Sequence, residues 1–517
     1  MKRVLLTSLA ALGACIVYAQ APVVPTRQKE DTKHIMSAGY WEVWNDEEQA
    51  RIDTDIEKYR KADASFVTGS VKSGTKVKVE QISSEFIFGA SAFNWNQLGS
   101  AERNAKYRNL FGTLFNRATI PLYWSTLEPV PGCPRYAPKY VDSEAWWNKA
   151  TNKTVQPHWR RPATDPIVEW CNAHGVDVHG HPLVWANRKT WPLWLQFDGI
   201  PMNERMALDT LEQQVYHALA QHESSYKTLP TEYIAAQVPT YIKSIETKFL
   251  QHVEDVMSHY AGRIQSWDVV NESARDYELK DLDPDAPMCR SHYGIVFPDY
   301  VFKSFKKANE CNGSGAILNI NDFALNDSYF EEIGNLLGRG AKIDVAGSQM
   351  HIFNPKQIED IAAGKHINPA VKLVEPEPVR KFFARFSQYG IDKTCISEIT
   401  IASAKGPDGE MVQAIIARNL YRLWFSVPSM MGITWWNLVD AGGAAGEPGR
   451  PGIFNGKMEP KPAYYALEKL INQEWRTNLE VKPDKQGMIT WRGFKGKYKI
   501  TWTDKDGADH TEIMEVK

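Results

Sequence analysis

The stretch Trp267-Asp268-Val269-Val270-Asn271-Glu272 decides the fold, together with a second stretch, Ile396-Ser397-Glu398-Ile399-Thr400. Each is a short apolar run that ends on or just before a carboxylate. Consecutive apolar residues such as Val269 and Val270 are typical of a parallel strand buried on both faces, and the glutamate then falls where the strand gives way to a loop. Two glutamates at strand ends, far apart in the chain, are typical of a barrel that gathers its polar groups at one rim.

Eight strands are expected between residues 86 and 475, each followed by a helical pattern or a long loop. They are Phe86–Ser91, Asn116–Ile120, Val176–His181, Ile264–Val270, Ala316–Asn321, Ile343–His351, Lys393–Ile399 and Met431–Asn437. This alternation predicts an α/β fold, a (β/α)8 TIM barrel with long rim-loop insertions. A doubly wound open sheet would require a glycine-rich phosphate loop after its first strand, and the sequence has none there.

The insertions follow the strand ends, so we expect them on the rim that carries the glutamates. They span residues 130–161, 187–231, 273–297 and 441–457. The first insertion carries Trp146, Trp147, Trp159, Arg160 and Arg161. These residues are candidates for substrate contacts, although an insertion that only shields the rim is an equally simple interpretation.

The two ends of the chain show short alternating apolar and polar patterns. Residues 22–50 indicate a linker or wrapping arm, residues 53–85 a short antiparallel β-segment, and residues 476–517 a second β-segment. Neither β-segment is long enough to bury much core alone, so we expect the two to pair into one small β-sandwich module. The expected divisions are therefore 1–21, 22–85, 86–475 and 476–517.

The first 21 residues indicate a secretory signal peptide, because a basic start precedes an apolar run and Ala19-Gln20-Ala21 offers small residues for cleavage. A secreted or periplasmic location follows. Leu12-Gly13-Ala14-Cys15 resembles a bacterial lipoprotein signal, which would anchor the mature chain at the outer surface through Cys15. The apolar run continues past Cys15, so simple secretion is favoured.

The composition gives no indication of several kinds of partner, and a membrane is expected only if Cys15 is lipidated. A net charge of −2 gives no reason to expect a nucleic acid or an anionic membrane. Removal of the leader with Cys15 leaves five of the six cysteines, so at least one thiol is free, and the disulfide pairing stays open. The sequence contains no Cys-x-x-Cys pair that would indicate zinc, and no cofactor is expected. The 18 tryptophans and 21 tyrosines suit stacking on sugar rings, or simply the core.

Paired carboxylates have a defined chemistry when a glycosidic bond lies between them. One is protonated and donates to the leaving oxygen, and the other attacks the anomeric carbon or activates water. The plainer interpretation is that each glutamate is a salt-bridged or capping residue. On the first interpretation the partner of Glu272 and Glu398 is a polysaccharide or oligosaccharide.

Trp267 to Glu272 resembles the acid/base motif of glycoside hydrolase family 10, the endo-1,4-β-xylanase family. Further landmarks resemble that family in its order, from about residue 86 to 472. They are Phe88-Gly89, Leu127-Glu128-Pro129, His174-Gly175, Gly180-His181-Pro182-Leu183-Val184-Trp185, Asn321-Asp322, Gln349-Met350-His351, Ser397-Glu398-Ile399, Trp436 with Asp440, and Lys461-Pro462-Ala463. The resemblance implies a retaining endo-β-glycosidase on a TIM barrel that degrades xylan or a related plant or algal polysaccharide.

The resemblance also implies roles for individual residues. Glu272 would be the general acid/base and Glu398 the nucleophile. The sugar-binding residues would be Asn271, His181, Trp185, Gln349, His351, Trp436 and Trp124. His179 shares a strand face with His181, so His-x-His is a weak indication of a metal, but no third ligand is in view and no metal is expected.

The departures from the family pattern concern the sugar-binding side. A Glu-Asn and a Lys-Trp that family members carry after the second strand are replaced by Thr119-Ile120-Pro121-Leu122-Tyr123-Trp124, of which only Trp124 fits. Ala186 replaces a histidine, and Gly442-Gly443-Ala444-Ala445 replaces a tryptophan. Xylan itself is therefore in doubt. A catalytically silent carbohydrate-binding protein and a hydrolase of small β-glycosides are the two alternatives.

Overall fold

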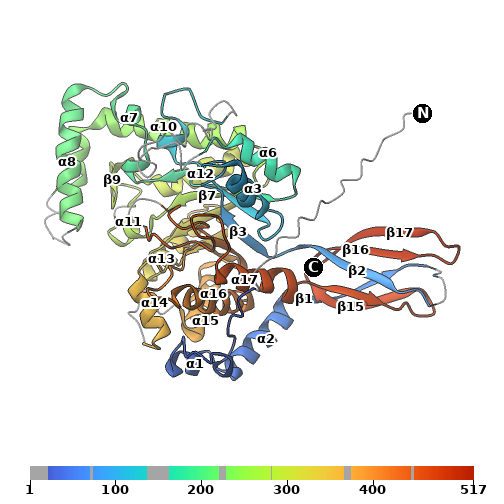
Figure 1. Cartoon of the computed structure of the whole chain (residues 1–517). Helices are drawn as coiled ribbons and strands as arrows, with labels where there is room; N and C mark the ends of the chain where they lie inside the picture. Colours follow the sequence, from blue (N-terminus) through green and yellow to red (C-terminus); the bar gives the residue numbers. More distant parts are fainter. Residues whose placement is uncertain are drawn as a thin grey trace, which may run out of the picture.

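The body of the protein is a closed barrel of parallel strands (Figure 1). The computed structural model describes residues 21–69, 71, 74–136, 162–220, 229–280, 282–365, 374–443 and 447–517. The barrel strands are β3 (Ile87–Ser91), β4 (Arg117–Pro121), β5 (Asp177–His181), β7 (Ser266–Asn271), β10 (Ile317–Asp322), β11 (Val345–Gln349), β12 (Thr394–Ile399) and β13 (Met430–Trp435). Pairing of β13 with β3 and of β10 with β7 closes the sheet. The predicted (β/α)8 fold is confirmed.

The strands are buried on both faces, which explains their apolar sequences. Every residue of β3, β4, β7 and β11 is buried, as parallel strands between a core and a ring of helices must be. The covering helices include α3 (Ala101–Asn109), α6 (Asp165–Ala173), α10 (Pro239–His259), α12 (Tyr300–Cys311), α13 (Asp327–Gly338), α15 (Pro376–Arg385), α16 (Gly409–Ser426) and α17 (Pro462–Glu468).

The N-terminal arm is helical, although the sequence indicated only a linker or wrapping arm there. It forms α1 (Ala38–Val43) and α2 (Asp46–Arg60), whose N-cap side chains Ser37 and Asn45 accept backbone N–H groups. Helix α2 covers α16, because Arg422 donates to Gln49 at 3.0 Å and to Asp53 at 2.6 Å. A helix therefore occupies residues 53–60, which were expected to begin a β-segment.

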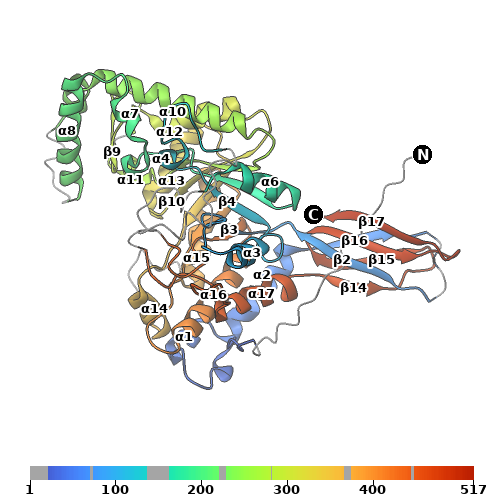
Figure 2. The same ribbon diagram turned by 45° about the horizontal axis from the view of Figure 1, so that its top comes forward.

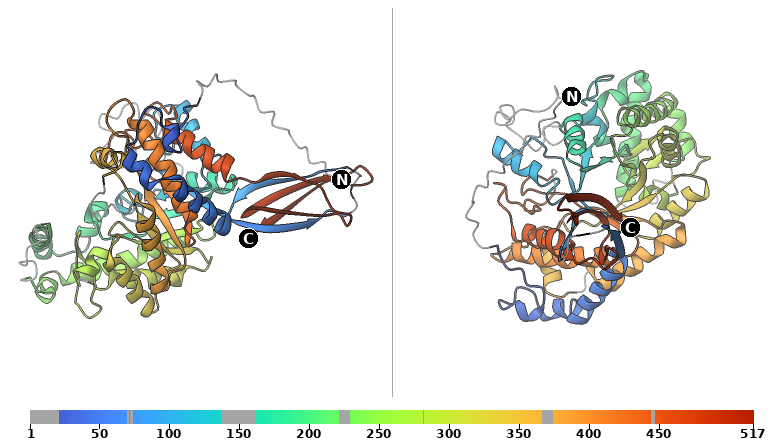
Figure 3. Two further views of the ribbon diagram at one scale, coloured as in Figure 1. Left: turned by 90° about the horizontal axis from the view of Figure 1, so that it is seen from below. Right: turned by 90° about the vertical axis from the view of Figure 1, so that its right-hand side faces the viewer.

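Strands from both chain ends form a β-module that projects from one side of the barrel (Figures 1 and 2). One sheet has the order β14-β2-β16-β17, and β1 pairs with β15. Their bounds are β1 (Lys61–Val67), β2 (Val77–Ser84), β14 (Asn478–Val481), β15 (Met488–Phe494), β16 (Gly496–Thr503) and β17 (Asp509–Val516). The module has its own core, which includes Val79, Trp491, Tyr498 and Trp502. Figure 3 shows it end-on against the barrel.

Two insertions at the rim carry defined structure. The first contains the short strand β6 (Val184–Trp185) and α7 (Leu193–Phe197), α8 (Met202–Ala220) and α9 (Thr231–Gln237), and α8 stands out at one edge of the molecule (Figures 1 and 2). The second follows β7 and contains α11 (Ala274–Glu278) and a hairpin of β8 (Cys289–Ser291) and β9 (Gly294–Val296). Residues 1–20 of the expected signal peptide, which include Cys15, lie outside the described residues, as do Trp146, Trp147, Trp159, Arg160 and Arg161.

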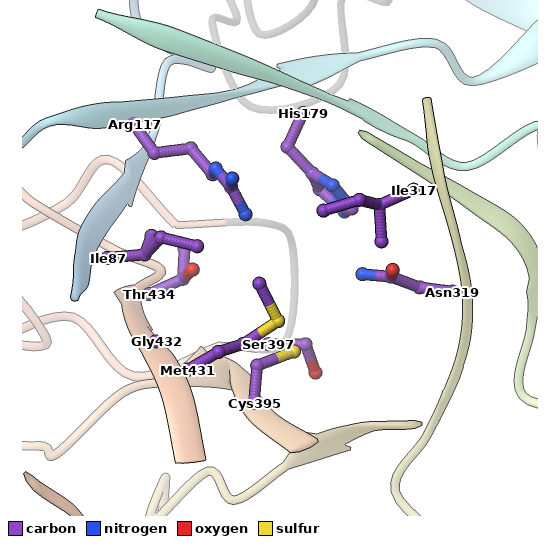
Figure 4. A pocket seen from close by; sticks show the side chains of 10 residues that line it. All are labelled: Ile87, Arg117, His179, Ile317, Asn319, Cys395, Ser397, Met431, Gly432 and Thr434. Carbon is purple, nitrogen blue, oxygen red and sulfur yellow. The ribbon is translucent and has the colours of Figure 1, made fainter. Parts of the chain in front are cut away.

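The barrel interior is filled with side chains. A cavity of about 20 Å³ remains below the rim, near the first residues of the strands (Figure 4). The guanidinium of Arg117 and the imidazole of His179 point into it, opposite Asn319 and Cys395. The substrate site must therefore lie above this packed layer. Among the described helices, none has an apolar stretch long enough to span a bilayer.

Candidate active site

The two candidate glutamates lie at the ends of β7 and β12, with β10 and β11 between them. Glu272 follows the last residue of β7 with a left-handed backbone, φ 60°. A non-glycine residue in this region is strained unless its surroundings hold it. The backbone N–H of Glu272 donates to the carbonyl of Asn321 at 2.7 Å, which fixes it to the end of β10.

Amide side chains on the intervening strands link the ends of β7 and β12. Asn321 on β10 donates from Nδ2 to Asn271 Oδ1 at 2.8 Å and to Glu398 Oε1 at 2.9 Å. Gln349 on β11 donates from Nε2 to Asn271 Oδ1 at 3.0 Å. One buried network therefore orients Asn271 and Glu398 together. Asn321 is one of the landmarks in the sequence, but it was not predicted as a site residue.

Two histidines lie beside Glu398, one near each carboxylate oxygen. His351 Nε2 lies 3.1 Å from Oε2, and His181 Nε2 lies 3.9 Å from Oε1. His181 Nδ1 is 2.7 Å from Asp268 Oδ2, and the same oxygen lies 2.9 Å from His179 Nε2. Asp268, inside the first quoted stretch but given no role there, thus explains the His-x-His pattern. Among the described residues, no cluster has the makings of a metal site.

Burial raises the pKa of both glutamates. For Glu272 desolvation dominates, the charges of Glu398 and Asp322 add to it, and the Tyr293 hydrogen bond opposes it, which leaves a pKa of about 8. For Glu398 desolvation is opposed by His181 and Asn321, which leaves a pKa of about 7. Both carboxyls therefore hold a proton to higher pH than a free glutamate does, which suits a site that needs a general acid.

Asp322 and Tyr293 border Glu272 and were not predicted as site residues. Asp322, at the end of β10, accepts from the backbone N–H of Ala274 at 2.8 Å and of Ala324 at 2.6 Å. The hydroxyl of Tyr293 lies 2.5 Å from Oε2 of Glu272. No sequence pattern marks Tyr293, because it sits in the hairpin of a rim insertion.

Aromatic rings form a wall beside the glutamates. Phe93 lies against Trp436 with centroids 4.8 Å apart and against Tyr123 at 6.0 Å. The ring centroid of Tyr123 lies 5.9 Å from that of Trp185, and the centroid of Trp185 lies 5.7 Å from that of Tyr293. The structure thus places Trp185 and Trp436, both predicted from the sequence, in one wall with three rings that were not.

Trp124 lies elsewhere, which corrects its assignment to the sugar-binding residues. Its ring stacks on His252 of α10 at 4.1 Å and packs edge-on against Phe249 at 4.9 Å. Its Nε1 donates to Glu128 at 2.8 Å, and the residue is 6% exposed. Trp124 is the first residue of the short helix α4 (Trp124–Leu127), which directs it toward α10, while the neighbouring Tyr123 contacts His181.

A buried ion pair supports the loop after β13. Lys461 Nζ lies 3.1 Å from Asp440 Oδ1 and 2.9 Å from the hydroxyl of Ser403. Asp440 Oδ1 also accepts from the backbone N–H of Gly452 at 2.9 Å. These two landmark residues therefore hold the loop after β13 in shape.

Comparison with known proteins gives one family. The family model described as Glycosyl hydrolase family 10 matches residues 141–470. Endo-1,4-beta-xylanase B of Thermotoga neapolitana is 25% identical over 340 residues, 62% of this chain and 78% of that protein. Endo-1,4-beta-xylanase A of Cellvibrio japonicus is 25% identical over 342 residues, 60% of this chain and 46% of that protein.

Solved xylanase structures also match this chain. Xylanase 10B from Thermotoga petrophila in complex with xylobiose has a TM-score of 0.49 and 21% identity, and the match covers 75% of this chain and 95% of that one. Native xylanase 10B from Thermotoga maritima has a TM-score of 0.48 and 21% identity, with 75% and 96% covered.

Proposed function

The chain belongs to glycosyl hydrolase family 10, and we propose that its substrate is β-1,4-linked xylan or a related plant or algal polysaccharide. It is a glycoside hydrolase of the retaining type. Retention requires two steps, in which a carboxylate first displaces the leaving group and water then displaces the carboxylate. The relatives named above are xylanases, which supports this class of substrate.

Glu398 is the nucleophile and Glu272 the general acid/base in this proposal. The carboxylate of Glu398 attacks the anomeric carbon while the proton of Glu272 passes to the departing oxygen, and a glycosyl ester forms. Esterification removes the charge of Glu398, so the proton affinity of Glu272 falls and Glu272 then takes a proton from the attacking water. The observation that carries the assignment is the pair of donors on Glu398, since Asn321 Nδ2 lies 2.9 Å from Oε1 and His351 Nε2 lies 3.1 Å from Oε2, as an attacking carboxylate requires.

The remaining site residues bind the sugar or hold the nucleophile. Asn271 hydrogen-bonds the 2-hydroxyl, a contact that strengthens in the transition state. Gln349 and Asn321 hold the side chain of Asn271 by its oxygen, which leaves its amide nitrogen to donate. Trp436 supplies a platform under the reacting sugar, since flat aromatic faces stack on sugar rings.

Activity and stereochemistry test this proposal directly. Release of reducing ends would be measured on a panel of β-linked polysaccharides, including plain, acetylated and glucuronic-acid-bearing xylans. Proton NMR of the first product would show the β-anomer, because two displacements restore the starting configuration. Initial formation of the α-anomer, or no release from any member of the panel, would contradict it.

Plain xylan is a poor substrate in this proposal. The charged hydrogen-bonding residues that family members carry after the second strand are absent, and Ile120 is fully buried there. Tyr123 instead lies against Trp185 and His181 as part of the aromatic wall. Each lost charged hydrogen bond costs about 1.5–3 kcal/mol. If the insertion supplies substitutes for these hydrogen bonds, deletion of residues 140–160 should strongly lower activity on the true substrate.

The protein is secreted or periplasmic in this proposal, with an outer-surface lipoprotein as the alternative. The basic and apolar character of the first 21 residues supports export. The mass of the mature protein would distinguish the two, since lipidation leaves Cys15 at the new N-terminus. A mature chain that retains Met1 would contradict export.

A further inference from the structure

Tyr293 contacts Glu272 from a hairpin. It lies in the turn between β8 and β9, and its hydroxyl is 2.5 Å from Oε2 of Glu272. Its ring packs edge-on against Trp185 at 5.7 Å, so the side chain is half-buried at the edge of the site. The hydroxyl donates to Oε2, which accepts both when Glu272 is ionised and when its proton lies on Oε1.

Hydrogen bonds with helices α11 and α10 hold the hairpin that carries Tyr293. Asp276 on α11 accepts from the backbone N–H of His292 at 2.5 Å and from the hydroxyl of Tyr300 at 2.8 Å. On the other strand, the hydroxyl of Tyr241 donates to the carbonyl of Ile295 at 3.2 Å. Buried groups therefore hold the residues on both sides of Tyr293, so its hydroxyl is placed before a substrate arrives.

We propose that Tyr293 is a positioning residue that holds Glu272 by Oε2 and leaves Oε1 to move the proton. This rests on the proposed function. In the first step the bond to the leaving oxygen breaks as that oxygen takes the proton from Oε1, and the ester to Glu398 forms. In the second step Oε1 takes a proton from water while water oxygen bonds to the anomeric carbon and the ester bond breaks.

The charges around this contact explain why a neutral phenol suits it. Glu272 faces Glu398 on β12 and Asp322 at the end of β10, and both raise its pKa. Tyr293 faces Glu272, Asp322 and Asp276, and its pKa is raised by burial and by these charges, so it stays a donor. Tyr293 thus stabilises the carboxylate form of Glu272, which the second step needs, against two repelling carboxylates.

The test compares Tyr293→Phe with Tyr241→Phe in the full chain. Tyr241→Phe removes a hydrogen bond to the same hairpin without touching Glu272, so it controls for loss of hairpin support. The probe is 2,4-dinitrophenyl β-xylobioside, whose leaving group needs no proton, so the second step limits turnover. We expect kcat to fall about tenfold in Tyr293→Phe and to stay within about twofold of wild type in Tyr241→Phe.

A second readout needs no substrate. The glutamate carboxyl carbons, labelled with ¹³C, would be titrated by NMR, with Glu272 identified by its absence in Glu272→Gln. Loss of a hydrogen bond to the charged form should move the Glu272 titration upward by about one pH unit in Tyr293→Phe alone. Coincident titrations of wild type and Tyr293→Phe, or an equal shift in Tyr241→Phe, would overturn the proposal. Absence of any glycosidase activity in wild type would refute the proposed function instead, and the titration would still decide the Tyr293 contact.

Discussion

His351 lies with Nε2 3.1 Å from Oε2 of Glu398, and this pair has one possible polarity once Glu398 is ionised. Burial lowers the pKa of His351 to about 4, so the ring is neutral near neutral pH. The carboxylate can only accept, so the proton sits on Nε2. His351 Nδ1 is buried without a hydrogen-bond partner in the described part of the chain, and the ring stacks on Phe353 at 4.3 Å. Stacking therefore keeps His351 in place.

We expect His351→Phe to lower kcat about 10- to 100-fold. The substitution keeps the stacking on Phe353 but removes a hydrogen bond to a charged carboxyl, which is worth about 1.5–3 kcal/mol. Steady-state kinetics would measure the loss. His174→Phe, at an exposed histidine stacked on Trp170, is the matched control and should change nothing. Equal kcat values in the two variants would refute a role for His351.

Glu398→Ala should abolish turnover by several orders of magnitude, because no group remains to form the ester. Azide, which fits the space left by the carboxyl, should restore cleavage of an activated aryl glycoside and give an α-glycosyl azide. NMR of that product checks the configuration. Lack of rescue, or a β-azide, would show that Glu398 is not the nucleophile.

Glu272→Ala should stop polysaccharide cleavage while sparing formation of the ester from activated aryl glycosides. General-acid help matters most when the departing oxygen is basic. Pre-steady-state release of the aryl alcohol would test this, and azide should here give a β-glycosyl azide. If both kinds of substrate lost activity equally, the acid/base role of Glu272 would be wrong.

The kcat/KM for polysaccharide should fall above about pH 8, where Glu272 loses its proton. Asp322, whose pKa burial raises to about 6, is charged at that pH and repels the ionised form of Glu272. Asp322→Asn removes this charge, so the pKa of Glu272 falls and the alkaline limb moves to lower pH. This is opposite in sign to Tyr293→Phe. If Asp322→Asn left the alkaline limb of kcat/KM unchanged while keeping the wild-type melting temperature, the electrostatic role of Asp322 would be wrong.

Lys461→Met should destabilise the protein by about 3–5 kcal/mol, since it leaves Asp440 buried without its cation. Lys461 is 2% and Asp440 12% exposed in the side chain. Urea unfolding would measure the change. Lys307→Met, which breaks the more exposed pair with Glu254, should cost less than about 1 kcal/mol. Similar losses of unfolding free energy in the two variants would mean that burial does not make the Lys461–Asp440 pair more important for stability.

The sequence was enough to predict the barrel, because parallel strands that are buried on both faces are continuous runs of apolar residues. Each of the eight expected strands overlaps an observed one, and the landmarks at their ends include six residues that the structure brings together: Asn271, Glu272, His181, Gln349, His351 and Glu398. Strand register explains this success. Residues at the ends of neighbouring parallel strands must meet at one rim whatever the loops do.

The site residues that the sequence did not predict correctly lie in loops and irregular turns. Tyr293 reaches Glu272 from a hairpin whose strands are three residues each, too short for a periodic signal. Trp124 was assigned by its place after the second strand, but a one-turn helix rotates it away and brings Tyr123 forward. Helix α2 was detectable, since Asn45 precedes three acidic residues, Asp46, Glu47 and Glu48, as in a capped N-terminus.

The pairing of the chain ends in the β-module has a consequence for the order of synthesis. Arg492 on β15 bonds Glu57 on α2 across 435 positions, and β2 is flanked by β14 and β16. During translation β1 and β2 therefore emerge long before their partners exist, and two strand edges stay open while the whole barrel is made. Such edges invite pairing with other chains. The pairing of these strands can therefore be completed only after residues 478–516 have been synthesised.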